Sequence, residues 1–265
     1  MVKAFQAAAV QMASAAGDIE ENLTVMRQWV QRLCNEHADL KLIVFPEFVT
    51  TGFVLGKQAK ALAESMDGKQ FQSLAVLAAE FGVHIIYGYA ERDSDGHIYD
   101  SLTLISDQGQ RLANYRKIHM TEFEKETFTA GKEVLTVDTA LGRIGLLICW
   151  DLAFPELVRM QALQGCDLIV ASSAWENPYG EDMHKFSQAK AIDNVIHVVV
   201  SNSIGTCSGF EFAGKSAIYD PTGNVKSQLN SEAGYALALI DPELQKQHRE
   251  GFYKMLSERR VDIYG

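Results

Sequence analysis

Two apolar runs in this sequence each stop at a residue that can take part in chemistry. The run "LIVFPE" ends on Glu47, and the run "LLIC" ends on Cys149. Between them, the segment "NYRKIHM" follows a strand-like stretch and carries Lys117. If the runs are sheet strands, their carboxyl ends open into a crevice where the three groups can converge. Glu47 can then act as a general base, Lys117 can lower a thiol pKa and hold an oxyanion, and Cys149 can form a covalent intermediate.

Each of these residues also has an ordinary structural interpretation. A cysteine after an apolar run is more often a core residue than a nucleophile. Glu47 could cap a turn, and Lys117 could be one more surface cation. The combination favours a site, because a glutamate directly after "IVFP" and an aspartate two residues after Cys149 are poor choices for burial alone. We expect that Asp151 holds the turn by accepting backbone N–H bonds and that Glu156 complements the next helix dipole.

Strand-like and helix-like segments alternate along the chain and must position these residues. The apolar patterns predict strands at 2–12, 39–48, 83–93, 97–109, 143–149, 195–203 and 234–243, and helices at 18–37, 69–81, 154–165 and 183–194. Residues 83–109 should form an antiparallel pair, and residues 211–225 a hairpin that turns at 220–223. The alternation indicates an α/β or α+β layered fold with helices on the outer faces of its sheets.

Two segments of the sequence resemble each other. The segments "RLCNEHADLKLIVFPEF" and "MQALQGCDLIVASSAW" both pass from a helix end through a short turn and Asp-Leu into a buried strand. Two such copies suggest a pseudo-symmetric pair of sheets, although any two βα units look somewhat alike, so a duplication stays open.

Composition limits the classes of function. With 265 residues and 47% hydrophobic content, the chain can bury one large core, so we expect residues 1–265 to form a single domain. A net charge of −10 disfavours nucleic acid and anionic lipid as partners and favours a small molecule. No apolar run reaches the roughly eighteen residues of a membrane span, and the N-terminal stretch reads as a strand rather than a signal peptide. The four cysteines show no metal-binding spacing, so we expect no metal or cofactor and a reducing cytoplasm.

At these residues the sequence also resembles a known family. The blocks "FPE" at 45–47, "YRKIH" at 115–119 and "CWDLAFPE" at 149–156 resemble, in order, the three signature blocks of the nitrilase, or carbon–nitrogen hydrolase, superfamily. The resemblance extends to "AAAVQM", "FTAGKE", "FAGKSAIYDPTG" and "RRVDIY", and so covers nearly the whole chain. It implies a four-layer αββα sandwich that usually forms a homodimer, with the tail at about 243–265 expected in the subunit contact.

The resemblance also implies roles for individual residues. The family's Glu-Lys-Cys triad falls on Glu47, Lys117 and Cys149. A second glutamate that supports the triad fits Glu124 best, with Glu122 as the alternative. We expect the backbone N–H of the residue after the cysteine, Trp150, to hold the oxyanion. The implied reaction is hydrolysis of a small amide, aliphatic or an α-keto acid amide as in ω-amidases, through a Cys thioester. N-carbamoyl amines and nitriles are the alternative substrates.

Residues that follow strand ends are the candidates for a substrate pocket. They are Phe48, Phe53, Trp150, Trp175, Glu176, Asn177 and His184, although aromatic residues at such positions are as often core. Some relatives carry an arginine in the following helix. This sequence has "KAIDN" there, with Lys190, which offers a point charge rather than a bidentate fork.

Two functions of other classes compete with the hydrolase. The segment "GFEFAGKS" at 209–216 matches the phosphate-binding pattern of P-loop NTPases, which requires a helix directly after the loop. The sequence after it, "SAIYDPTG", instead predicts a strand and a turn, which disfavours an NTPase. A catalytically silent binding protein on the same scaffold is the other alternative, and the three competent triad residues do not favour it.

Overall fold

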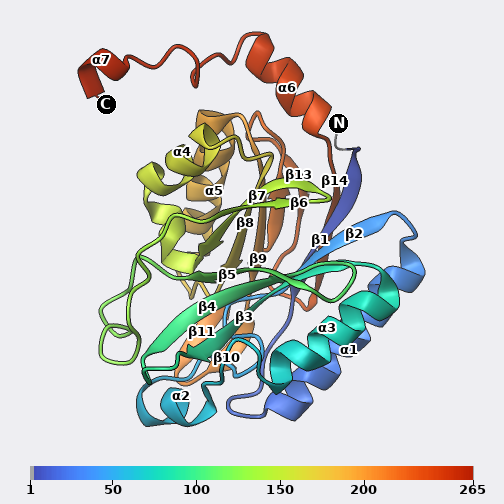
Figure 1. Ribbon diagram of the computed structural model, residues 1–265, viewed down its shortest axis with the longest axis vertical. Helices are drawn as coiled ribbons and strands as arrows, with labels where there is room; N and C mark the ends of the chain where they lie inside the picture. The colour runs from blue at the N-terminus through green and yellow to red at the C-terminus, as the bar shows by residue number, and fades with distance from the viewer. Residues whose placement is uncertain (1–2, 265) are drawn as a thin grey trace.

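Two six-stranded sheets lie at the centre of the computed structural model, which describes residues 3–264 (Figure 1). The first sheet has the order β14-β1-β2-β3-β4-β5, with β14 at Gly234–Ile240, β1 at Phe5–Gln11, β2 at Leu40–Val44, β3 at His84–Arg92, β4 at Ile98–Ile105 and β5 at Arg111–Arg116. The second has the order β13-β12-β9-β8-β7-β6, with β13 at Val225–Gln228, β12 at Ala217–Tyr219, β9 at His197–Asn202, β8 at Leu168–Ser173, β7 at Gly142–Ile148 and β6 at Thr136–Thr139.

Helices cover the outer faces of both sheets (Figure 1). On the first sheet lie α1 at Ile19–Glu36 and α3 at Lys69–Phe81, and on the second lie α4 at Pro155–Leu163 and α5 at Gly180–Asn194. The remaining helices are the short α2 at Gly56–Leu62, α6 at Pro242–Glu250 and α7 at Val261–Tyr264. The arrangement is the expected αββα sandwich. None of the helices described is both long and apolar enough to cross a membrane.

Each sheet contains three neighbouring parallel strands. In the first they are β1, β2 and β3, and in the second β7, β8 and β9. The two similar segments of the sequence form α1–β2 and α4–β8, so each supplies the middle strand of its parallel set. Because β2 and β7 both belong to these parallel sets, the residues after β2 and the residues after β7 lie at carboxyl ends of parallel strands in the two facing sheets.

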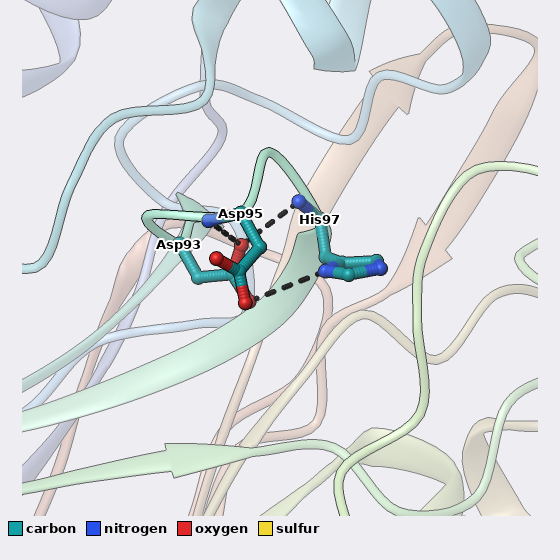
Figure 2. A group of neighbouring side chains, drawn as sticks. All are labelled: Asp93, Asp95 and His97. Atoms are coloured by element: carbon teal, nitrogen blue, oxygen red, sulfur yellow. Dashed lines mark hydrogen bonds and ion pairs between the residues drawn. The ribbon is translucent and has the colours of Figure 1, made fainter.

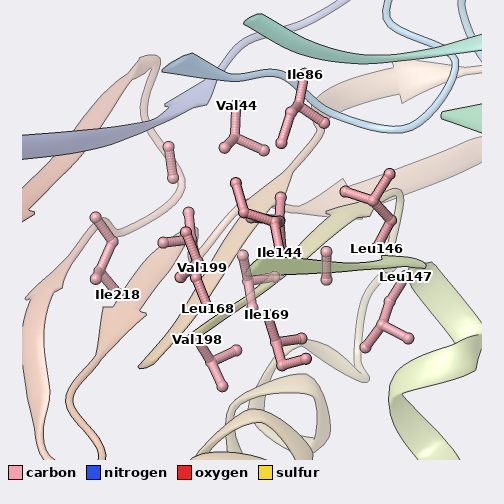
Figure 3. Packing of buried hydrophobic residues seen from close by; sticks show 14 of the residues in the cluster. Val44, Ile86, Ile144, Leu146, Leu147, Leu168, Ile169, Val198, Val199 and Ile218 are labelled. Atoms are coloured by element: carbon pink, nitrogen blue, oxygen red, sulfur yellow. The ribbon is translucent and has the colours of Figure 1, made fainter. Parts of the chain in front are cut away.

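The main core fills the space between the sheets (Figure 3). Val44 and Ile86 of the first sheet belong to the same buried cluster as Ile144 and Val199 of the second. Apolar contact between two β faces is the main stabilisation of such a sandwich. A polar contact also crosses the interface, because the Ser172 hydroxyl donates a 2.7 Å hydrogen bond to the Phe45 carbonyl.

Most predicted elements are present, with differences at their ends. The helix at 69–81 has its predicted bounds, and Asp18 caps α1 by accepting a hydrogen bond from the Glu21 N–H. Helix α5 begins at Gly180 rather than at residue 183, and the sequence analysis missed α2 and the small hairpin of β10 at Ile204–Cys207 and β11 at Phe210–Ala213. The predicted turn at 220–223 is held by Asp220, whose carboxylate accepts from the Thr222 and Asn224 N–H groups.

The P-loop alternative is wrong for this chain. Residues Phe210–Ala213 form β11, which pairs with β10 at Ile204–Cys207. The segment after Lys215 and Ser216 is strand β12, so no helix aims its N-terminus at a phosphate. Lys215 instead forms an ion pair with Glu181.

The turn between β3 and β4 contains two acids and a histidine (Figure 2). One oxygen of Asp93 accepts hydrogen bonds from the backbone N–H groups of Asp95, at 3.0 Å, and His97, at 2.9 Å. The other carboxylate oxygen lies 3.5 Å from the His97 ring nitrogen. These local bonds stabilise the hairpin turn and explain why the three residues lie together.

Candidate active site

Lys117 lies at the centre of a buried group of three carboxylates. Its Nζ atom is 2.6 Å from Glu47 Oε1 and 2.6 Å from Glu124 Oε1. The third carboxylate is Asp100, whose Oδ2 lies 3.2 Å from the same nitrogen. All four side chains are at most 2% exposed. The three acids are close enough together to hold a metal ion, but the ammonium group already occupies their centre.

Backbone pairing and close packing place these groups. Lys117 directly follows β5, and its N–H donates a 2.9 Å hydrogen bond to the Asp100 carbonyl on β4. Glu47 lies in the turn after β2, packed against Gly88 of β3. A Cβ atom at Gly88 would come within 2.7 Å of the Glu47 Cα, so a larger residue there would displace the carboxylate.

Glu124, not Glu122, reaches the lysine. One oxygen of Glu124 contacts Lys117, and the other accepts a 2.8 Å hydrogen bond from the Thr121 N–H. Glu122 is exposed and forms a 2.6 Å ion pair with Lys125. The geometry therefore supports Glu124 as the supporting glutamate.

Cys149 begins a 3₁₀ turn at the end of β7. Its backbone has a φ of +45°, a left-handed conformation that costs energy for a residue with a side chain. Asp151 holds the turn by accepting hydrogen bonds from the Ile148 N–H, at 3.1 Å, and the His119 N–H, at 3.0 Å. It also accepts one from the Tyr115 hydroxyl at 2.8 Å. These bonds match the bracing role expected for Asp151.

The surroundings of the Cys149 thiol favour its neutral form. Burial raises its pKa well above the usual thiol value, the Glu47 carboxylate raises it further, and Lys117 opposes both. Although burial disfavours its charge, Glu124, Glu47 and Asp100 raise the pKa of Lys117 well above the usual lysine value. Lys117 therefore lowers the thiol pKa as expected, but burial and the carboxylates outweigh this effect.

Asp100 is the member of this cluster that the sequence analysis missed. Burial, and then the Glu47 carboxylate, raise its pKa well above the usual aspartate value. Within the described residues, Asp100 Oδ1 and Glu47 Oε2 are buried without a hydrogen-bond partner, and Asp100 Oδ2 has only its ion pair with Lys117. Both effects favour the protonated form of Asp100, whose O–H can serve as a hydrogen-bond donor to a neighbouring carboxylate oxygen. An aspartate inside the apolar strand "IYDSLTL" was the signal available in the sequence.

A cavity of about 700 Å³ opens beside this cluster. Cys149 lines it together with three of the predicted pocket residues, Trp150, Trp175 and Glu176. Its other lining residues come from the loop after Lys117 and from the region around the start of α5: Met120, Thr121, Glu122, Phe123, Lys125, Tyr179, Asp182, Lys185 and Phe186.

His184 was predicted for this pocket, and that prediction is corrected by its position. The side chain lies on the face of α5 that is turned toward the sheet, where one ring nitrogen contacts the Tyr219 hydroxyl. The other ring nitrogen lies 3.0 Å from the Gln228 amide nitrogen. Helical periodicity explains the difference, because Asp182, Lys185 and Phe186 occupy the face that lines the cavity.

Three other candidates also lie outside the residues that line the cavity. Phe53 and Phe48 pack in an aromatic cluster, with ring centroids 5.5 Å apart. The Asn177 N–H donates a 2.8 Å hydrogen bond to the Glu211 carbonyl at the edge of β11. Lys190, in place of the family arginine, is buried with its Nζ 5.7 Å from the Phe186 ring centroid.

The proton on Asp100 leads to a prediction about stability. An acid whose pKa is raised by folding binds its proton more tightly in the folded state, so stability falls as pH rises above its unfolded pKa, about 3.8. Asp100→Asn keeps the shape and a donor but cannot ionise. We expect its melting temperature at neutral pH to exceed that of the wild type by roughly 2–4 °C, with the gain shrinking toward pH 4.

Asp138→Asn is the matched control for this measurement. Asp138 is exposed, and its hydrogen bonds with Arg143 lower its pKa, so the substitution should not raise the melting temperature. The melting temperatures are measured by calorimetry. A lower melting temperature of Asp100→Asn than of the wild type at neutral pH would show instead that Asp100 is ionised in the folded protein.

The raised thiol pKa leads to a second prediction. Ultraviolet difference absorbance between the wild type and Cys149→Ala should show no thiolate from Cys149 at neutral pH. Cys166→Ala serves as a control, because burial raises the pKa of that thiol to about 12. A thiolate signal assigned to Cys149 at neutral pH would contradict the geometry described above.

Comparison with known proteins identifies the family. The carbon–nitrogen hydrolase family model matches residues 6–250. The chain is 36% identical to a probable nitrilase of Schizosaccharomyces pombe, over 97% of this chain and 96% of the other. It is 31% identical to an (R)-stereoselective amidase of a Pseudomonas species, over 97% and 92% of the two chains. A nitrilase-superfamily crystal structure from Saccharomyces cerevisiae superposes with a TM-score of 0.89, at 25% identity over 94% of each chain. The chain therefore belongs to the carbon–nitrogen hydrolase family and is an enzyme of the amidase type.

Proposed function

We propose that this enzyme hydrolyses a small amide to a carboxylic acid and ammonia or an amine, with Cys149 as the nucleophile. The observation that carries the proposal is that Cys149 lines a cavity of substrate size beside Glu47, which Lys117 holds in place. The family membership supports this reaction. N-carbamoyl amines and nitriles are the alternative substrates of the same machinery.

The first half of the proposed reaction forms a thioester. Glu47 accepts the Cys149 proton as the sulfur attacks the carbonyl carbon, because the thiol is neutral at rest. Lys117 and the Trp150 N–H stabilise the negative oxygen of the tetrahedral intermediate. The C–N bond then breaks, and Glu47 passes its proton to the leaving nitrogen.

The second half returns the enzyme to its starting state. Glu47, again ionised, accepts a proton from a water molecule that attacks the thioester carbonyl. The C–S bond breaks, the acid leaves, and the proton returns to the Cys149 sulfur. Glu124 touches only the lysine and the Thr121 N–H in this arrangement, so we assign it the role of positioning Lys117.

The nucleophile is tested by release of ammonia. Over a panel of amides, carbamoyl compounds and nitriles, Cys149→Ala should lower turnover by at least about a thousandfold. Cys34→Ala changes a half-buried thiol on α1 and should retain nearly full activity. Ammonia release that survives Cys149→Ala would disprove the mechanism.

We further propose that residues 1–265 act as one domain and that the tail joins two copies into a homodimer. The segment from α6 to α7 extends away from the sheets (Figure 1). Its apolar side chains are exposed, with Phe252 at 90%, Val261 at 60% and Ile263 at 68%. Exposed apolar residues in such a segment are typical of an interface.

Removal of residues 251–265 tests the role of the tail. Light scattering should report a dimer for the full chain and a monomer for the shortened one, because the exposed apolar contacts are lost. Val76→Ser, which removes an exposed apolar side chain on α3, should leave the dimer intact. A dimer that survives the deletion would place the interface elsewhere.

The free thiols support our proposal for the compartment. All four cysteines are free, and burial raises the pKa of Cys149, Cys166 and Cys34. This state supports the proposal of a reducing cytoplasmic location.

A further inference from the structure

We infer that the cavity selects amides whose acyl chain carries a positive charge, with Glu176 as the counter-ion. The inference rests on the proposed hydrolase function and names the substrate class for that site. It is argued from the charges and aromatic rings of the lining residues.

The charges at the outer part of the cavity cancel in pairs. Lys125 forms a 2.6 Å ion pair with Glu122, and Lys185 forms a 2.9 Å ion pair with Asp182. Each pair joins residues three positions apart, and all four side chains are substantially exposed. Neither lysine is therefore left as an uncompensated cation for an anionic substrate.

Glu176 differs from these four residues. It is half-buried and lines the cavity, and no ion pair to its carboxylate is present among residues 3–264. Burial raises its pKa, Glu47 and Glu124 raise it further, and Lys117 acts in the opposite direction. The field around Glu176 is therefore negative, and an ammonium group beside it would be stabilised.

The backbone around Glu176 is held rigidly. The Ala213 N–H donates a 2.9 Å hydrogen bond to the Trp175 carbonyl, and the Asn177 N–H donates a 2.8 Å bond to the Glu211 carbonyl. The Trp175 N–H donates to the Asn202 side chain at 2.7 Å. A carboxylate presented from a fixed backbone binds a charged group with little loss of entropy.

A carboxylate-bearing acyl chain would lack a counter-ion here. No arginine is among the residues found to line the cavity. Lys117 is already surrounded by three carboxylates, and Lys190 is buried against the Phe186 ring. A carboxylate on the acyl chain would therefore be repelled by Glu176 with no cation nearby to offset the repulsion, and this lowers affinity.

Aromatic rings complete the recognition of a cationic chain. Trp150 and Trp175 have ring centroids 5.5 Å apart, and Trp175 and Phe186 have centroids 5.9 Å apart. This continuous wall starts at the residue next to Cys149 and suits an apolar stem. Indole faces also attract ammonium groups through cation–π interactions.

Three amides of matched length test the inference: δ-aminovaleramide, which is cationic, hexanamide, which is neutral, and adipamate, which is anionic. We expect kcat/KM to fall in that order, with roughly a tenfold difference between the cationic and neutral amides. Glu176→Gln should bring the ratio of kcat/KM for δ-aminovaleramide to kcat/KM for hexanamide close to one. Glu80→Gln, an equal charge change on α3, should leave that ratio as in the wild type.

Binding separates this inference from the proposed function. Quenching of indole fluorescence by the three amides, measured on Cys149→Ala, reports affinity without turnover, because Trp150 and Trp175 line the cavity. If the affinity order holds but neither these amides nor the panel described above releases ammonia, the inference stands and the proposed reaction fails. If adipamate binds more tightly than δ-aminovaleramide, or Glu176→Gln leaves the affinity ratio unchanged, the inference is overturned.

Discussion

The ion pairs of Lys117 are the interaction on which the rest of the site depends. A buried ammonium group is costly unless other charges compensate it, and here three buried carboxylates surround it. If all three were ionised, the cluster would carry a net charge of −2. A proton on Asp100 lowers that charge to −1 and leaves Glu47 and Glu124 as the partners of the lysine. Burial, and then the Glu47 carboxylate, raise the pKa of the neighbouring Cys149 thiol.

The sandwich brings together groups that lie far apart in the sequence. Glu47, Asp100 and Lys117 come from the first sheet, whereas Cys149 follows β7 of the second. The apolar core between the sheets sets the distance between these two groups of residues (Figure 3). Stability of the core and geometry of the site are therefore linked, and Gly88 shows how little free space remains at their junction.

Charge and aromatic surface divide the cavity into two parts. Near Cys149, the lysine and its carboxylates suit proton transfer and stabilisation of an oxyanion. Farther out, Trp150, Trp175 and Phe186 form an apolar wall, and Glu176 adds one uncompensated charge. The first part is expected of any enzyme with this triad, whereas the second belongs to the loops of this particular chain. The wall residues come from the segments after β7 and β8 and from α5, outside the strands of the two sheets.

The sequence by itself determined the layered fold and singled out Glu47, Lys117 and Cys149 as the proposed reactive group, because strand periodicity and three ordered blocks are local patterns. It also determined Asp151 as a brace, since a short acid near a turn bonds to the local backbone. Only the tertiary structure decided which groups surround Lys117, and so revealed Asp100. It also decided that His184 faces the sheet while Glu176 faces the cavity. Burial and the pKa of a group depend on residues brought close by folding, and no local pattern records those distances.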